Sequence, residues 1–321
     1  MKGFLELSRV PVSLMAAFSA GTGYVLIAPS WALSHAWIPV LGVFSLAAGA
    51  SALNQVQERN DDALMERTRN RPLPSGRILP GKAVAFAMMA ILFGLALLLW
   101  TDGLPPRFCM GILHPAPTNA WMPIQDAAPA APSSFSLLPC ALGAFSIIWY
   151  NGFYTPLKRK SAFAAVPGAV AGALPPAIGW SMGGGSLQDP ALLMLMTFLF
   201  LWQVPHFWLI VLKREDEYRR AGFPLPTDRI PSRRFRAVVL SWMAAASLVA
   251  LALPLFGPLG HPLLFGSVLV SILIMAWLAA RSFLGTAMKI PSLQGAYLAL
   301  NLFAVLVLVL SAAGRLMEFR P

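Results

Sequence analysis

Long apolar stretches, separated by short polar segments, make up most of this chain. A helix needs roughly 20 apolar residues to cross a bilayer, and several stretches come close to that length. The predicted spans are 8–28, 37–56, 82–101, 135–157, 162–182, 190–212, 235–255, 262–284 and 293–314. The pattern therefore predicts an all-α integral membrane protein that folds as a bundle of nine transmembrane helices.

The amino-acid composition supports this prediction. Hydrophobic residues make up 57% of the 321 residues, and charged residues make up only 12%. Soluble globular domains usually contain about a quarter charged residues. The composition thus excludes an ordinary soluble domain.

The net charge of +11 raises the question of a nucleic-acid partner. If the N-terminus is cytoplasmic, nine spans place all but three of the 24 Lys and Arg residues inside; the exceptions are Arg107, Arg315 and Arg320. Such a bias is the positive-inside rule of membrane proteins. We therefore expect no nucleic-acid partner, a retained first span, and a multi-pass protein of the cell inner membrane whose C-terminus lies outside.

An outer segment interrupts the regular succession of spans. Residues 101–135 contain seven prolines and predict an irregular loop inserted into a single membrane-embedded domain, residues 1–321. Cys109 and Cys140 both fall on this outer side. They form either a disulfide or two unpaired thiols that behave as small apolar residues.

The densest charged segment, residues 54–77, follows the second span directly. Asn54, Glu58 and Asp62 recur every four residues, so on a helix only about 40° separates successive members and all three share one face. Arg67 and Arg71 follow within the same segment. The spacing predicts a ladder of oxygen ligands beside basic side chains at the membrane edge.

Two further polar clusters fall on the same predicted membrane face. Lys158 and Arg159 follow the fourth span, and Lys213, Asp216 and Glu217 follow the sixth. Within the sixth span, His206 is either a functional residue or a buried histidine with a satisfied hydrogen bond; the sequence favours neither reading.

Acids and bases held together at a membrane edge suit an anionic substrate that carries a metal ion. Mg²⁺ prefers oxygen ligands and shares them with phosphate, and Arg clamps phosphate oxygens. An adjoining apolar bundle indicates a diphosphate with a lipid-like tail. The alternative is that the polar loops only fix the topology. It explains the bases, but it does not explain why eight of the 13 Asp and Glu residues lie in the two charged segments 54–77 and 213–236.

Several motifs together resemble the UbiA-type membrane prenyltransferases, specifically their protohaem IX farnesyltransferase branch. The resemblance covers the chain from about residue 8 to 314, apart from the outer insertion. It is carried by MERTRNRPLPSG at 65–76, YTPLKRKS at 154–161, GALPPAIGW at 172–180, WQVPHFW at 202–208 and KREDEYRRAGFPLP at 213–226.

The resemblance implies transfer of a farnesyl group from farnesyl diphosphate to a vinyl group of haem b, giving haem O, with the lipid bilayer and a haem A synthase or oxidase assembly factor as partners. It implies a catalytic Mg²⁺ and diphosphate site. The metal-holding residues would be Asn54, Glu58, Asp62, Asp216 and Glu217, and the diphosphate-binding residues Arg67, Arg71, Lys158, Arg159 and Lys213. His206 would lie near the haem.

This sequence departs from the family pattern at a few positions. Glu58 replaces an Asp, Asn60 stands where another Asp is common, and Ala164 and Pro167 replace an Asn and an aliphatic residue. These departures leave open the same diphosphate chemistry with a quinone precursor or other aromatic lipid as acceptor. An alternative from a different class of function is a haem-binding assembly factor or transporter without catalysis.

Overall fold

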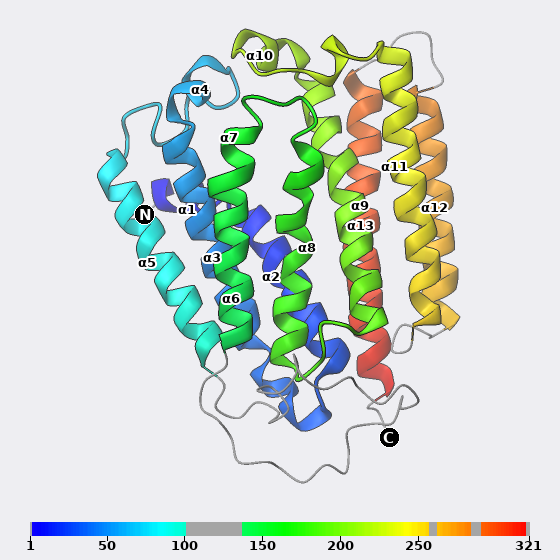
Figure 1. The fold of residues 1–321 in the computed structure, drawn as a ribbon. Helices are drawn as coiled ribbons and strands as arrows, with labels where there is room; N and C mark the ends of the chain where they lie inside the picture. Colours follow the sequence, from blue (N-terminus) through cyan, green and yellow to red (C-terminus); the bar gives the residue numbers. More distant parts are fainter. Residues whose placement is uncertain (1, 101–136, 257–261, 284–289, 319–321) are drawn as a thin grey trace.

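The computed structural model describes residues 2–100, 137–256, 262–283 and 290–318, and within these ranges it contains helices and no strand (Figure 1). The predicted insertion at 101–135 and Cys109, one half of the possible disulfide, lie outside the described residues. The long helices are α2 (Val10–Ile27), α3 (Trp37–Gln57), α5 (Pro80–Leu99), α6 (Leu137–Ile147), α8 (Ala165–Met182), α9 (Pro190–Lys213), α11 (Ser232–Ala252), α12 (Pro262–Phe283) and α13 (Ile290–Glu318).

Short helices extend or connect the long ones. A π-helical segment, Ile148–Tyr154, continues α6 and leads into α7 (Thr155–Leu157). The remaining short elements are α1 (Lys2–Leu7), α4 (Arg59–Leu64), α10 (Glu215–Arg220) and 3₁₀ turns at Ser30–His35, Pro226–Asp228 and Leu253–Leu255.

The protein is a multi-pass membrane protein. In the part of the chain that the structure describes, seven helical stretches are long and apolar enough to cross a membrane. The two other predicted spans correspond to α8, which contains Pro175 and Pro176, and to α12, whose apolar stretch Phe265–Leu278 is shorter. The all-α class is confirmed, and the count of nine spans stays a prediction.

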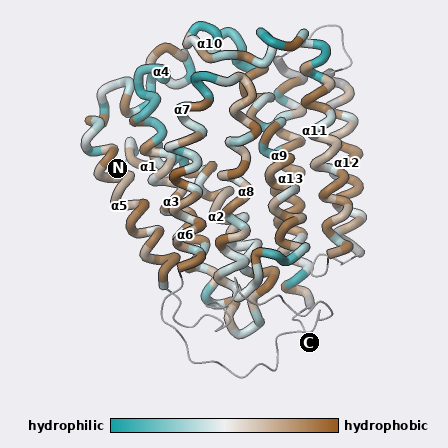
Figure 2. Tube along the Cα trace, viewed as in Figure 1, coloured by the Kyte–Doolittle hydropathy of each residue, from teal (hydrophilic) through white to brown (hydrophobic). Residues whose placement is uncertain are grey.

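Polar residues gather at the two ends of the bundle, and apolar residues fill the length between them (Figure 2). The short helices α4 and α10 lie at the same end, which we call the polar end (Figure 1). Each follows a long helix, α3 or α9, after one non-helical residue, Glu58 or Arg214. The fold therefore brings the two charged segments of the sequence to one end of the molecule.

Helix α2 packs directly against α8 through small residues. A Cβ atom added at Gly179 would lie 1.8 Å from the Ala20 carbonyl oxygen, and one added at Gly23 would lie 2.2 Å from that of Pro176. The two backbones approach this closely because glycine has no side chain, as is common between membrane helices. This contact fixes the position of α2 beside the interior of the bundle.

We expect Gly179→Ala to destabilise the protein, because the new methyl group meets backbone and not a flexible side chain. Overpacking of this kind costs about 1–3 kcal/mol. Thermal unfolding in detergent should show a lower midpoint than for the wild type. Gly266→Ala in α12, where an added Cβ meets no atom within 4 Å, is the matched control. Equal midpoints for the two variants would contradict the close contact between α2 and α8.

Candidate active site

The predicted ladder survives at the polar end, although it crosses a break between two helices. Helix α3 ends at Gln57, and Glu58 has φ −105° and ψ 8° before α4 begins. Helical hydrogen bonds continue across the break, from the Glu58 amide to the Asn54 carbonyl at 3.0 Å and from the Asp62 amide to the Glu58 carbonyl at 2.8 Å. The spacing of four residues is therefore preserved.

The first two members of the ladder bind each other and two residues of the next polar cluster. The Asn54 Nδ2 amide donates to Glu58 Oε1 at 3.0 Å and to the Thr155 hydroxyl at 3.1 Å. Glu58, which is 5% exposed, forms an ion pair with Lys158. Burial lowers the pKa of Lys158, and the Glu58 carboxylate acts in the opposite direction. These contacts join α3 to α7.

The third member of the ladder is held by the loop that follows α4. Arg71 Nη1 donates to both carboxylate oxygens of Asp62, at 2.9 and 2.8 Å. The Thr68 hydroxyl donates to the Asp62 carbonyl oxygen at 2.8 Å. The loop thus folds back so that a base from each of two segments, Lys158 and Arg71, neutralises one acid of the ladder.

The second charged segment contacts the first through Glu217. This carboxylate accepts a hydrogen bond from Arg214 at 2.8 Å and one from the backbone amide of Arg67 at 3.5 Å. Burial raises the pKa of Glu217, but the hydrogen bonds from Arg214 and Arg67 outweigh it and hold the pKa below its ordinary value. Asp216, which precedes it, is exposed. Glu217 therefore links the two segments, and Asp216 faces away.

A cavity of about 710 Å³ opens behind these residues, and we call it the inner cavity. Acids and bases line its polar part: Arg9, Glu58, Asp61, Asp62, Arg67, Arg71 and Lys158. Its lining extends from Glu58, just after α3, along that helix to Val43, which at 1.5 Å per residue is about 22 Å. Along that length the wall includes Met15, Ala16, Leu46, Ala47 and Ala50. A charged end therefore continues into an apolar channel.

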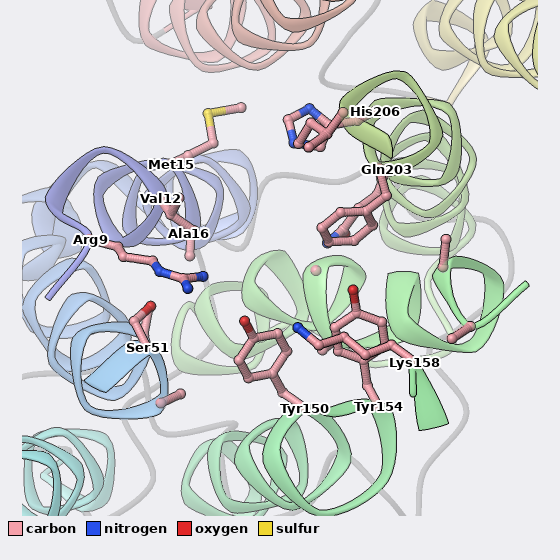
Figure 3. A pocket seen from close by; sticks show the side chains of 18 of the residues that line it. Arg9, Val12, Met15, Ala16, Ser51, Tyr150, Tyr154, Lys158, Gln203 and His206 are labelled. Atoms are coloured by element: carbon pink, nitrogen blue, oxygen red, sulfur yellow. The ribbon is translucent and has the colours of Figure 1, made fainter. Parts of the chain in front are cut away.

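Arg9 is a lining residue that the sequence did not single out. Figure 3 shows its side chain extending from the start of α2 toward the space shared by Tyr150 and Lys158. The backbone of Arg9 has φ 42°, a left-handed conformation that is unfavourable for residues other than glycine. Its Nε atom is buried without a hydrogen-bond partner. Its place at the basic start of the first predicted span was the only sequence signal.

The tyrosines beside Arg9 depend on the π-helical segment. Tyr150 and Tyr154 stack with ring centroids 5.6 Å apart, and both line the inner cavity. Asn151 anchors the same turn by donating to the Ala50 carbonyl at 3.0 Å. Short π-helical turns occur often at functional sites. The sequence indicated only that this span ends in aromatic residues.

His206 also lines the inner cavity, away from the ladder. Its Nδ1 atom lies 2.8 Å from the Asn301 side-chain oxygen, and the rings of Trp202 and Tyr297 lie at centroid distances of 5.0 and 5.1 Å. The imidazole is therefore hydrogen-bonded and still faces the cavity. Both interpretations of this histidine that the sequence allowed are consistent with the geometry.

Two predicted diphosphate-binding residues do not line the inner cavity. Arg159 pairs with Asp61 at 2.6 Å and donates to the Gln57 carbonyl at 2.8 Å. Lys213 donates to Gln294, and its Nζ atom lies 4.6 Å from the centre of the Tyr297 ring. The structure thus brings Arg67, Arg71 and Lys158 to the cavity and places Arg159 and Lys213 beside it.

The predicted metal ligands differ in how well their positions suit Mg²⁺. No cluster of three or more Asp, Glu, His or Cys residues suited to a metal occurs among the described residues. Asn54, Glu58 and Asp62 nevertheless offer the amide and carboxylate oxygens that Mg²⁺ prefers. The Asn54 Oδ1 atom is buried and has no hydrogen-bond partner. Glu58 and Asp62 line the inner cavity, whereas Asn54, Asp216 and Glu217 are not among its lining residues. The two carboxylates fit a cation in the cavity, and Asn54, whose amide nitrogen binds Glu58, keeps its orphaned oxygen behind them.

Comparisons with known proteins agree on one family. The chain matches the UbiA prenyltransferase family over residues 13–113 and 128–289. A protoheme IX farnesyltransferase from Geobacter sulfurreducens is 39% identical over 253 residues, which cover 79% of this chain and 81% of the relative. Another from Nitratidesulfovibrio vulgaris is 36% identical over 282 residues, covering 88% of this chain and 84% of the relative.

Solved structures share the fold at low identity. A UbiA homologue from Archaeoglobus fulgidus, bound to DMAPP and Mg²⁺, has a TM-score of 0.61 at 15% identity and covers 97% of this chain and 98% of its own. A homologue from Aeropyrum pernix K1 without ligand has a TM-score of 0.67 at 16% identity, covering 97% and 99%. At these identities the likeness concerns the fold alone.

Glu217→Gln tests the contact between the two charged segments. Because the pKa of Glu217 is depressed in the folded protein, its charge stabilises the fold above the ordinary value of 4.5 and loses this effect as the pH falls through the folded pKa. The wild type should therefore melt at a higher temperature than the variant at pH 7. The difference should shrink below about pH 4.5. Thermal unfolding between pH 7 and 4 measures it.

Asp216→Asn is the matched control for this measurement, because Asp216 is exposed and next in sequence. It should leave the midpoint nearly unchanged at every pH. A midpoint difference between wild type and Glu217→Gln that did not vary with pH would contradict the role of the Glu217 charge.

Proposed function

Because the chain belongs to the UbiA prenyltransferase family, as its sequence motifs predicted, we propose that it transfers a farnesyl group from farnesyl diphosphate to a vinyl group of haem b, giving haem O. One structural observation carries this proposal: the inner cavity joins a cluster of acids and bases to an apolar channel. A diphosphate with a long prenyl tail has the same two halves. The names of the relatives support farnesyl as donor group and haem as acceptor.

The bases at the polar end bind the diphosphate in this proposal. Arg9, Arg67, Arg71 and Lys158 line the cavity from three separate segments. Charge-assisted hydrogen bonds from such groups to phosphate oxygens are about twice as strong as neutral ones. Lys158 and Arg71 now pair with Glu58 and Asp62. When substrate and cation bind, these two bases would donate to phosphate oxygens in place of the carboxylates.

Asn54, Glu58 and Asp62 would hold Mg²⁺. When bound, the ion would stabilise the negative charge that develops on the diphosphate as it leaves. The oxygens of these side chains would hold the ion, and Lys158 and Arg71, which now pair with Glu58 and Asp62, would neutralise further charge on the diphosphate. Glu58 replaces the Asp of the family pattern, so the oxygen it offers lies one methylene further from the backbone.

The reaction breaks the bond between the first farnesyl carbon and the diphosphate oxygen, and the electron pair leaves with the diphosphate. That carbon then bonds to the terminal carbon of the vinyl group. Water supplies a hydroxyl to the remaining vinyl carbon and releases a proton, which balances the step. The apolar channel between Val43 and Ala50 keeps other water away from the prenyl chain.

The acceptor would lie in the part of the inner cavity lined by His206, Trp202 and Tyr297. Aromatic rings there offer flat apolar surfaces to a planar macrocycle. Ala164, one of the departures from the family pattern, is also among the lining residues. A quinone precursor is therefore the alternative acceptor that the experiment must test.

We propose that the polar end faces the cytoplasm of a cell with an inner membrane, where farnesyl diphosphate and Mg²⁺ are dissolved. The excess of Lys and Arg in the segments at this end supports that orientation. The product would pass to a haem A synthase or an oxidase assembly factor. No sequence feature calls for a nucleic-acid partner.

The acceptor is tested by incubating purified protein with farnesyl diphosphate, Mg²⁺ and either haem b or a panel of aromatic quinone precursors. We expect the mass of haem O and no prenylated quinone precursor. Asp62→Asn should lower the rate by about 100-fold or more, because a charge that acts on the leaving group is lost. Glu66→Gln, an exposed acid of the same segment, should retain activity.

Prenylation of a quinone precursor alone would overturn the choice of acceptor and keep the diphosphate chemistry. Asp62→Asn with undiminished activity would exclude a metal and diphosphate site at this position and favour a non-catalytic role.

Diphosphate binding can be measured apart from turnover. Arg67→Ala and Lys158→Ala should each weaken binding of farnesyl thiodiphosphate by about 10- to 100-fold, since a charged hydrogen bond contributes about 1.5–3 kcal/mol. Both side chains line the inner cavity. Lys160→Ala, an exposed base two residues from Lys158, is the control. If both variants bind with unchanged affinity and remain folded by gel filtration, these bases do not bind the diphosphate and only fix the membrane topology.

A further inference from the structure

A second hollow, of about 510 Å³, lies at the polar end between α1, the start of α2 and the loop after α4. We call it the outer pocket. Its polar lining residues are Lys2, Glu6, Arg9, Arg67, Asn70 and Arg71. Four of these six carry a positive charge and one carries a negative charge. The pocket therefore favours anions.

The outer pocket and the inner cavity share part of their walls. Arg9, Pro11, Arg67 and Arg71 line both. The three guanidinium groups consequently stand between the two spaces. An anion released beside Arg71 in the inner cavity would meet the same side chains on its way into the outer pocket.

Contacts around the outer pocket leave its positive charge largely uncompensated. Glu6, its one acid, accepts hydrogen bonds from Arg77 at 3.1 and 2.7 Å, so its charge is neutralised from outside the pocket. Arg71 pairs with Asp62. Within the described part of the chain, Lys2, Arg9 and Arg67 have no carboxylate within ion-pair distance.

The backbone between the two helices aims Arg9 at this boundary. Its left-handed conformation, φ 42° and ψ 55°, separates α1 from α2. Neighbouring hydrogen bonds hold it, from the Ser13 hydroxyl to the Ser8 carbonyl at 2.7 Å and from Gln55 to the Leu7 carbonyl at 2.8 Å. A strained residue of this kind costs about 1–3 kcal/mol and persists where its surroundings over-determine it. The buried, unpartnered Nε of Arg9 is the group left for a ligand.

We propose that the outer pocket is a binding site for inorganic diphosphate, through which the leaving group passes from the inner cavity to water. The proposal rests on the proposed function for the origin of the anion. The pocket itself requires only an anion with phosphate oxygens. Because the headgroups of anionic lipids carry the same chemistry, the experiment separates the two sources.

The test is equilibrium binding of radiolabelled inorganic diphosphate to the full-length protein in phosphatidylcholine nanodiscs, with Mg²⁺ and saturating farnesyl thiodiphosphate in the inner cavity. The wild type should bind one further diphosphate. Lys2 and Asn70 line the outer pocket but not the inner cavity. The variants Lys2→Glu and Asn70→Glu should each weaken the binding of this further diphosphate at least tenfold. Arg69→Glu, exposed on the same loop and lining neither space, should bind like the wild type.

Absence of the further diphosphate in the wild type, or equal affinity in Lys2→Glu and Arg69→Glu, would overturn the proposal. The same assay on the wild type is repeated in nanodiscs that contain phosphatidylglycerol. If this lipid displaces diphosphate from the wild type, the pocket is a lipid-headgroup site and the proposed route is wrong; undiminished binding supports the route. The assay needs neither haem nor turnover, so a failure to make haem O would leave its result unaffected.

Discussion

Charges withdrawn from water require partners, and this requirement organises the polar end of the protein. Glu58 and Asp62 are 5% and 4% exposed, and removing one partner of a buried ion pair costs about 3–5 kcal/mol. Lys158 and Arg71 supply the compensating charges from two other segments. The pairs therefore hold α3, α7 and the loop after α4 together. They also keep both acids and bases at the mouth of an apolar channel, where, in the proposed reaction, an anionic substrate and a cation would exchange partners with them.

The fold and the ladder followed from sequence because both depend on short-range spacing. Apolar stretches of sufficient length specify spans whatever their partners. Asn54, Glu58 and Asp62 keep their spacing of one turn because helical hydrogen bonding continues through the break at Glu58, and Glu58 and Asp62 both reach the inner cavity. The positions of Arg9 and Tyr150 in the inner cavity could not be predicted from the sequence. Their positions depend on a left-handed residue and a π-helical turn, which form only when the surrounding helices hold them.

For the second charged segment, too, the sequence predicted only part of what the structure shows. Its acids and its place at the same end of the bundle as the first segment (Figure 1) could be predicted from the sequence, but the rotation of α10 could not. That rotation buries Glu217 against the Arg67 amide and leaves Asp216 exposed. Glu217 consequently braces the loop that carries Arg67 and Arg71. The second segment therefore contacts the first through the hydrogen bond between Glu217 and the Arg67 amide.

We propose that the charged end and the apolar channel form one site for one prenyl diphosphate. Photolabelling tests it most directly, with a farnesyl diphosphate analogue that carries a diazirine at the far end of its tail. Peptide mapping should place the adduct on residues that line the channel, in the stretches 43–50 of α3 or 12–19 of α2, and excess farnesyl diphosphate should abolish it. Adducts confined to residues outside the cavity, such as the exposed Trp277 of α12, and unaffected by competitor would contradict this proposal.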